Sequence, residues 1–169
     1  MSGGPDRFPG FDALSQVRHW DPVTADAVLA RVAPPAAVKF FTDSQEACAR
    51  ALLNLLTGQE DGDLAVPVLE MVDARLAAGE TDGWRYADMP KDGQAWRDTL
   101  AYLDGDAHER FVTSFAGASR EEETELVQAV QDADRWHGMP AGHVWSLWTR
   151  YACTAFYSHP AAWAEIGFP

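Results

Sequence analysis

Residues 144–169 read VWSLWTRYACTAFYSHPAAWAEIGFP and carry the strongest structural signal in the chain. Apolar residues recur there at the i, i+3, i+4, i+7 spacing of an α-helix: Val144, Leu147, Trp148, Tyr151, Ala152 and Ala155. A second stripe runs beside the first: Trp145, Thr149, Cys153 and Phe156. The polar strip that remains is narrow: Ser146, Arg150 and Thr154. We therefore expect a helix buried on nearly all sides, either as a central core helix or with part of it at a partner surface.

The segment that follows this helix is aromatic and has few charges. Residues 158–160, Ser-His-Pro, predict the end of the helix, because proline lacks the backbone N–H that continues it. Trp163, Ile166 and Phe168 lie beyond this point, where a small domain has little core left to cover them. An apolar tail of this kind favours a surface that binds another protein.

Composition limits the possible functions. The chain has 169 residues, of which 47% are hydrophobic, enough for one sizeable core but too few for two comfortable domains. The 26 acidic and 13 basic side chains give a net charge of -13, which disfavours binding to nucleic acid or to an anionic membrane. No apolar run approaches the length that spans a membrane, so membrane insertion is not expected. The N-terminus has no secretory signal pattern, so we expect a cytoplasmic protein.

Start and stop signals predict an all-α fold. Residues 1–20 are rich in glycine, proline and polar side chains, so we expect a flexible, extended arm before a single helical domain over residues 21–169. No segment alternates with a period of two. The fold expected is an irregular bundle of about six helices. Capping residues and apolar periodicity place helices upstream of the aromatic one as follows: residues 21–34, 42–58, 66–79, from about 95, a short helix over 106–115, and from 119.

The chemistry-bearing residues form no recognisable catalytic or cofactor motif. Glycine-rich phosphate loops and a Gly-x-Ser-x-Gly elbow are both missing, so we expect this chain to bind no cofactor and not to be an enzyme by itself. Asp134 and His137 come nearest to a metal-binding spacing, but they occur as a single copy, so no metal site is expected. Cys48 and Cys153 are expected as reduced thiols in the core. A disulfide would require their helices to face each other in an oxidising compartment.

A long loop over residues 80–94 contains Trp84, Arg85 and Tyr86, and Trp96-Arg97 follow it. Three interpretations fit these aromatic and arginine pairs. The rings can pack inward beneath the arginines, form the edge of a protein interface, or offer platforms on which a sugar stacks. The third interpretation has no support from polar residues, because no cluster of polar side chains accompanies these rings.

Several motifs resemble one known family. Residues 155–160 (AFYSHP), Trp163 and residues 165–169 (EIGFP) resemble the C-terminal signature of the gluconate 2-dehydrogenase subunit 3 family. Shorter similarities lie upstream: residues 40–42, 82–86 and 95–97. Two features depart from the pattern. The chain lacks the twin-arginine signal of many relatives, and it has Pro160-Ala161-Ala162 where many carry Gly-Gly-Asn.

This resemblance implies a small, non-catalytic accessory subunit that binds and stabilises a large dehydrogenase subunit, or assists its folding or export. The partner would be a flavoprotein of the glucose-methanol-choline oxidoreductase type, with FAD on the partner and with a cytochrome c subunit as a further possible member of the complex. Export would then require a signal-bearing partner. The interface residues expected are Trp84, Tyr86, Trp145, Phe156, Tyr157, Trp163, Ile166 and Phe168. Two alternatives remain open: a free-standing homo-oligomeric helical protein, and an enzyme with an unrecognised site.

Overall fold

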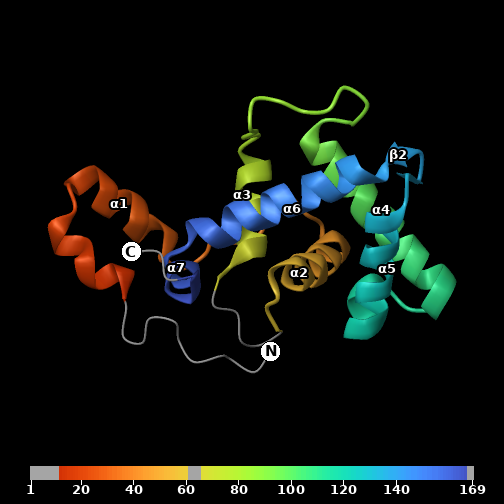
Figure 1. Ribbon diagram of the computed structural model, residues 1–169, viewed down its shortest axis with the longest axis horizontal. Coiled ribbons are helices and arrows are strands. Elements are labelled where there is room, and N and C mark those ends of the chain that lie inside the picture. Colours follow the sequence, from red (N-terminus) through yellow and green to blue (C-terminus); the bar gives the residue numbers. More distant parts are fainter. Residues whose placement is uncertain (1–11, 61–65, 167–169) are drawn as a thin grey trace.

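Figure 1 shows the computed structural model of the chain, which describes residues 12–60 and 66–166. The prediction of an all-α fold is confirmed: the described residues form helices and one minimal hairpin. The elements, in chain order, are η1 (Ala13–His19), α1 (Pro22–Arg31), α2 (Asp43–Thr57), α3 (Val68–Ala77), α4 (Asp92–Phe111), η2 (Phe115–Gly117), α5 (Arg120–Asp132), β1 (Arg135–Trp136), β2 (Met139–Pro140), α6 (Ala141–Ser158) and α7 (Pro160–Ile166). Here η marks a 3₁₀-helix.

Helix α6 is the centre of the fold. It crosses the body of the molecule and packs against α2, α3, α4, α5 and α7 (Figure 1). The first apolar stripe predicted from the sequence is buried along its whole length. The second stripe is not: Trp145, Thr149 and Phe156 are half-buried and Cys153 is exposed. The prediction of burial on nearly all sides is therefore wrong, because Trp145 and Phe156 are only partly covered by the core against which they pack and Cys153 is exposed.

The core is built around large aromatic side chains. Trp96, Trp148, Tyr151 and Phe115 are each almost fully buried. Trp96 meets Tyr151 edge to face at 5.8 Å between ring centroids, an arrangement worth about 0.5–1.5 kcal/mol beyond the area it buries. The indole N–H of Trp148 donates to the hydroxyl of Thr99 at 3.1 Å, which satisfies a polar group that burial would otherwise penalise.

Three of the described helices, α1, α2 and α5, begin where the capping signals predicted, whereas α4 begins at Asp92 rather than near Ala95. The carboxylate of Asp21 accepts from the backbone N–H groups of Val23 and Thr24 at the start of α1. At the start of α5, the N–H of Ser119 donates to the Glu122 carboxylate at 2.8 Å, and the N–H of Glu122 donates back to the Ser119 hydroxyl. These local bonds explain why the starts of α1, α2 and α5 could be read from the sequence.

Helix α4 differs from its prediction. Residues 92–111 form one helix of 20 residues, so the separate helix expected over residues 106–115 does not exist. Leu103 and Ala107 are both fully buried, so the apolar face continues past Gly105. One internal glycine costs a helix about 1 kcal/mol, less than the burial of that face contributes. The helix ends at Val112, whose backbone is left-handed at φ 61°.

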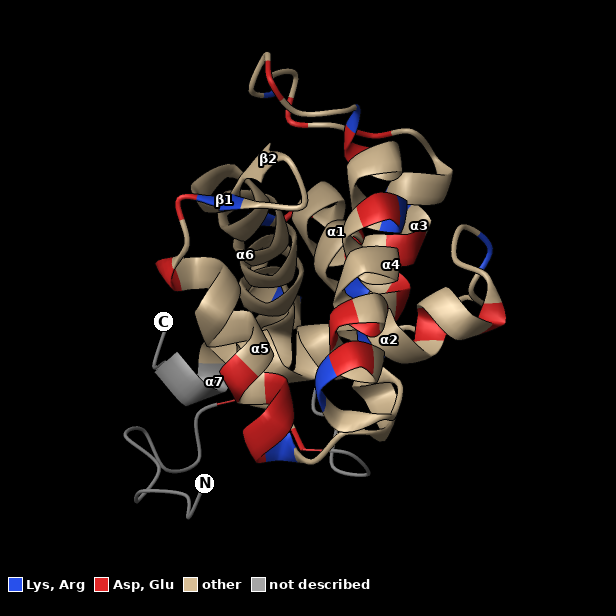
Figure 2. Cartoon of the chain, turned by 90° about the vertical axis from the view of Figure 1, so that its right-hand side faces the viewer, with Lys and Arg blue, Asp and Glu red and all other residues tan. Residues whose placement is uncertain are grey.

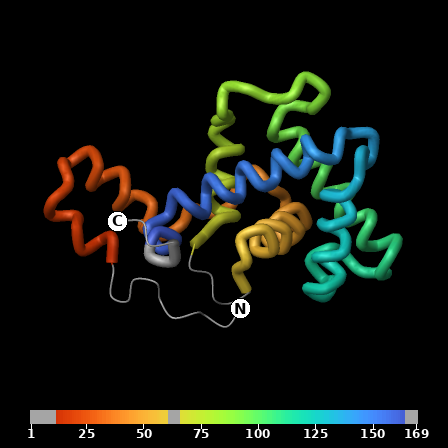
Figure 3. Tube along the Cα trace, in the orientation of Figure 1, coloured from red at the N-terminus to blue at the C-terminus, as the bar shows by residue number. Residues whose placement is uncertain are grey.

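The two chain ends also differ from expectation. Ala13–His19 form a 3₁₀-helix that contacts α7, so this part of the expected arm is not extended, while residues 1–11 lie outside the described residues. Pro160 does end α6, but it also begins α7, because its fixed φ suits the first position of a helix. Figure 3 shows η1 and α1 at the end of α6 that lies far from α4 and α5. The Arg31 guanidinium holds this corner by donating to the Ser158 carbonyl at 3.0 Å.

Among the described helices, none combines the length and the apolar character needed to cross a bilayer.

Candidate functional site

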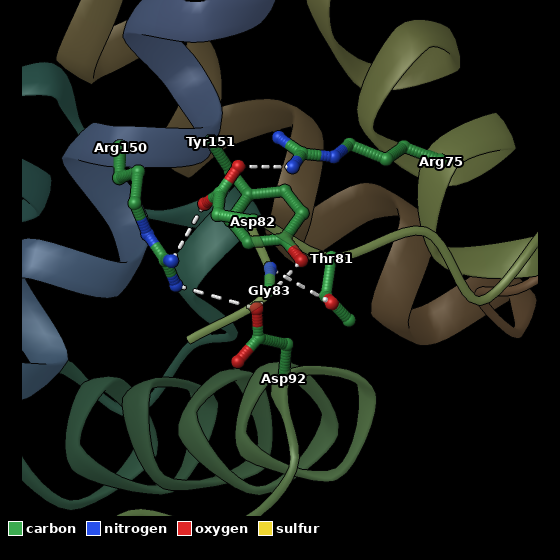
Figure 4. A network of polar contacts seen from close by, with 7 residues as sticks. All are labelled: Arg75, Thr81, Asp82, Gly83, Asp92, Arg150 and Tyr151. Atoms are coloured by element: carbon green, nitrogen blue, oxygen red, sulfur yellow. Dashed lines mark hydrogen bonds and ion pairs between the residues drawn. The ribbon is translucent and has the colours of Figure 1, made fainter. Parts of the chain in front are cut away.

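The 78–91 loop, which joins α3 to α4, is fixed to the body by a network of charged side chains (Figure 4). Asp82 in the loop accepts from Arg150 of α6 at 2.6 Å and also from Arg75 of α3. Asp92, the first residue of α4, accepts from the Tyr151 hydroxyl at 2.8 Å and from Arg150 at 3.3 Å. Arg150 therefore joins the loop and α4 to the central helix.

Burial makes this network structurally important. Asp92 and Tyr151 are buried, and the Arg150 side chain is only 18% exposed. Burial and the hydrogen bond to Asp92 raise the pKa of the Tyr151 phenol well above its ordinary value. Removing one member of a buried ion pair costs about 3–5 kcal/mol, because the remaining charge is left without compensation. The network thus holds the loop in one position on α6.

The turn within the loop depends on glycine. Gly83 has φ +76°, in the left-handed region that a residue with a Cβ rarely adopts. Its N–H donates to the Thr81 hydroxyl at 3.2 Å. The turn presents the next residue, Trp84, to solvent on one side and to Arg150 on the other.

Three of the predicted interface aromatics are exposed: Trp84 and Tyr86 of the loop, and Tyr157 of α6 itself. Trp84 is 50% exposed and Tyr86 is 37% exposed, so the interpretation that the rings pack inward is wrong for these two, whereas it is confirmed for the fully buried Trp96. The rings of Trp84 and Tyr86 meet edge to face at 5.4 Å, and Tyr86 stacks on His143 of α6 at 3.6 Å. Tyr157, also 50% exposed, follows Arg150 by two turns on the same side of α6. We call Trp84, Tyr86 and Tyr157 the aromatic surface.

The other predicted interface residues lie elsewhere. Trp145 and Phe156 are half-buried and pack against the core. Trp163 is also half-buried, and its indole N–H donates to the Tyr157 carbonyl at 2.7 Å, which satisfies an acceptor near the C-terminal end of α6. These three rings therefore take part in this chain's own packing. The side chains of Ile166 and Phe168 lie outside the described residues.

The histidine and cysteine pairs do not form the sites considered from the sequence. His137 does not pair with Asp134; its ring bonds to Asp106 of α4 at 2.8 Å and stacks on Tyr102. Within residues 12–60 and 66–166, no three metal-ligating side chains come together.

Both thiols are free, as predicted, but Cys153 is exposed rather than in the core. Burial raises the pKa of the Cys48 thiol far above its ordinary value, which makes this thiol unreactive.

The sequence did not indicate a cavity beside the loop. An open cavity of about 590 Å³ lies between the end of α3, the 78–91 loop and the start of α4. Its walls include Trp84 and Tyr151, together with three basic residues: Arg85, Lys91 and Arg97. All but one of its lining residues lie between positions 76 and 97, and the exception, Tyr151, comes from α6. The packing of the loop against α6 that completes the cavity depends on this distant contact, which no local motif reveals.

Comparison with known families identifies the chain. The sequence model of the family described as gluconate 2-dehydrogenase subunit 3 matches residues 43–169, the span from the start of α2 to the C-terminus. The chain belongs to this family, as its C-terminal motifs predicted. No curated protein and no solved structure shows significant similarity to it.

Proposed function

We propose that this chain is a non-catalytic accessory subunit that binds and stabilises the large, flavin-containing subunit of a dehydrogenase acting on sugars, sugar acids or related alcohols. Its membership of a family of gluconate 2-dehydrogenase subunits supports an assembly with other chains. The flavin and the oxidation chemistry then belong to the large subunit, because the sequence of this chain contains no phosphate-binding loop for a dinucleotide.

The aromatic surface is the observation that carries this proposal. Tryptophan, tyrosine and arginine are the side chains most enriched at the energetic centres of protein interfaces. Here Trp84 and Tyr86 are exposed, yet ring contacts and the Arg150 network hold them in place. A surface ordered before binding loses little conformational entropy when a partner docks, so more of the contact energy appears as affinity.

Co-expression tests the proposed function. The large flavoprotein subunit should be produced with and without this chain, and its soluble yield, bound flavin and dehydrogenase activity compared. We expect soluble, flavin-loaded and active enzyme only when the two chains are co-expressed, and both chains should then elute together in gel filtration. A large subunit equally soluble and active alone, with no co-elution, would contradict the proposal.

Self-association is the alternative that the same surface permits. If the purified chain forms a stable homodimer that Trp84→Ala disrupts, and no flavoprotein binds it, the aromatic surface pairs two copies instead. Analytical ultracentrifugation of the wild type and of Trp84→Ala distinguishes the two cases.

A further inference from the structure

The cavity beside the 78–91 loop has an unusual charge for this protein. The chain as a whole carries 26 acidic and 13 basic side chains. Acidic residues spread over α2, α4 and α5, as Figure 2 shows. The cavity wall nevertheless includes three basic residues, Arg85, Lys91 and Arg97.

None of these three cations forms an ion pair with any residue that the structure describes. Arg85 donates to the Met89 carbonyl at 2.7 Å. Arg97 donates to the Phe40 carbonyl at 3.3 Å, and its guanidinium lies 4.0 Å from the centre of the Phe40 ring. Lys91 is exposed at the start of α4. Carbonyl and ring contacts orient the two arginines but leave their charge uncompensated.

The carboxylates of the cavity wall compensate this charge only in part. Asp92 is already bound to Arg150 and to the Tyr151 hydroxyl. Glu80 is exposed and, within the described residues, forms no ion pair. Three free cations therefore face one free carboxylate, in a cavity that also offers the half-exposed ring of Trp84.

We propose that this cavity binds a segment of the large subunit that places one or more carboxylates beside a large apolar side chain. The apolar side chain would pack against Trp84, and the carboxylates would pair with Lys91 and Arg97. This inference rests on the proposed accessory function and specifies the chemistry of the partner surface. Charge complementarity argues for it, because an acidic segment is the counterpart of the cavity wall while most of the remaining surface repels it.

The shape of the cavity favours a protein segment over a small molecule. The cavity is broadly open, and Trp84 belongs both to its wall and to the aromatic surface. A continuous peptide chain can occupy both places at once. A small sugar acid would fill the cavity alone and would leave Tyr86 and Tyr157 uncovered.

Charge reversal in the assembled complex tests the proposal. Affinity for the large subunit should be measured for the wild type, Lys91→Glu, and the double variant Lys91→Glu/Arg97→Glu. The matched control is Arg18→Glu/Arg135→Glu, which reverses two exposed arginines remote from the cavity. We expect binding about tenfold weaker for the double variant and within about twofold of wild type for the control. Lys91→Arg should bind like the wild type, and the salt dependence of binding should decrease in Lys91→Glu.

Folding controls accompany these measurements. Arg97 also contacts Phe40, so far-UV circular dichroism and thermal melting should confirm that each variant is folded. Among the described residues, the Lys91 side chain forms no hydrogen bond or ring contact, so Lys91→Glu alone tests the charge. A folded Lys91→Glu/Arg97→Glu variant that binds as tightly as wild type would overturn this inference while leaving the accessory function intact. Failure of the wild type itself to bind any flavoprotein would instead refute the accessory function.

Photo-crosslinking identifies the segment directly. The photoreactive amino acid p-benzoylphenylalanine should replace Gln94, an exposed residue of the cavity wall, and the crosslinked peptide should be sequenced by mass spectrometry. We expect a peptide of the large subunit that contains Asp or Glu next to a large apolar residue. A peptide without acidic residues contradicts the proposal.

A titration of the isolated chain with gluconate is a separate test. Saturable shifts of the NMR signal of the Trp84 indole would contradict the proposal, because they would indicate a site for a small anion.

Discussion

The guanidinium of Arg150 lies 4.7 Å from the centre of the Trp84 ring, which brings a helix residue and a loop residue 66 positions apart into direct contact. The same guanidinium bonds to Asp82 and Asp92. One side chain of the central helix therefore fixes both the backbone of the loop and its most exposed aromatic ring.

We expect Arg150→Ala to destabilise the protein strongly. Asp92 is buried and would lose a charged partner, so the free energy of unfolding should fall by about 3 kcal/mol. Arg110→Ala is the matched control: Arg110 forms an exposed ion pair with Glu125, and its loss should cost less than about 1 kcal/mol. Urea unfolding measures both variants, and similar losses in the two would argue against a structural role for the network.

Tyr151 gives a prediction at high pH. The pKa of its phenol is raised in the folded state, so the unfolded chain loses this proton first. The free energy of unfolding should therefore fall as the pH rises above about 10, the ordinary pKa of tyrosine. Tyr151→Phe should remove this part of the pH dependence and, by removing the hydrogen bond to Asp92, should cost about 1–3 kcal/mol at pH 7. The exposed Tyr157→Phe is the control and should change neither quantity appreciably.

His159 gives a prediction at low pH. Burial lowers the pKa of its ring, and its Nδ1 accepts from the backbone N–H of Ala161 at 3.2 Å. Below the ordinary pKa of about 6.5, the unfolded chain binds a proton that the folded chain resists, so the free energy of unfolding should decrease as the pH falls below this value. His159→Asn retains an acceptor without titrating. Urea unfolding at pH 7.5 and pH 5 should show a smaller loss of stability in the variant than in the wild type.

The sequence predicted the features that depend on local interactions. The buried stripe of α6, from Val144 to Ala155, follows from helical spacing alone, and the start of α5 follows from Ser119 and Glu122. The sequence predicted two helices where α4 is one uninterrupted helix, because burial of the face around Leu103 and Ala107 is a tertiary effect that local signals do not report.

The arrangement of the site could not be predicted in the same way. Trp84 and Tyr86 were identified as interface candidates from their residue type, but their exposure depends on contacts with Arg150 and His143 that are distant in sequence. Trp163 was expected to be available to a partner, yet its indole bonds to the carbonyl of Tyr157 within this chain. A tryptophan near a chain end can pack within its own chain or bind a partner, and only its contacts in the structure distinguish these two roles.

Replacing Trp163 and replacing Trp84 should therefore change the stability of the isolated chain by different amounts. Trp163→Ala removes a half-buried ring and its hydrogen bond, so the isolated chain should lose about 2–3 kcal/mol of stability. Trp84→Ala removes an exposed ring and should cost less than about 1 kcal/mol. Thermal melting of the isolated variants measures this contrast. If Trp84→Ala is the more damaging substitution, the loop aromatics serve the fold of this chain rather than a partner.

The most direct test of the account is the affinity of the purified chain for the large flavoprotein subunit after Trp84 and Tyr86 are both replaced by alanine. Isothermal titration calorimetry should compare this double variant with the wild type and with Val23→Ala/Val112→Ala, which alters two apolar residues that are exposed elsewhere. We predict that Trp84→Ala/Tyr86→Ala binds at least about 30-fold more weakly, the scale of one hot-spot aromatic, while the valine control binds like the wild type. Unchanged affinity in a folded double variant would contradict the claim that the aromatic surface binds the dehydrogenase.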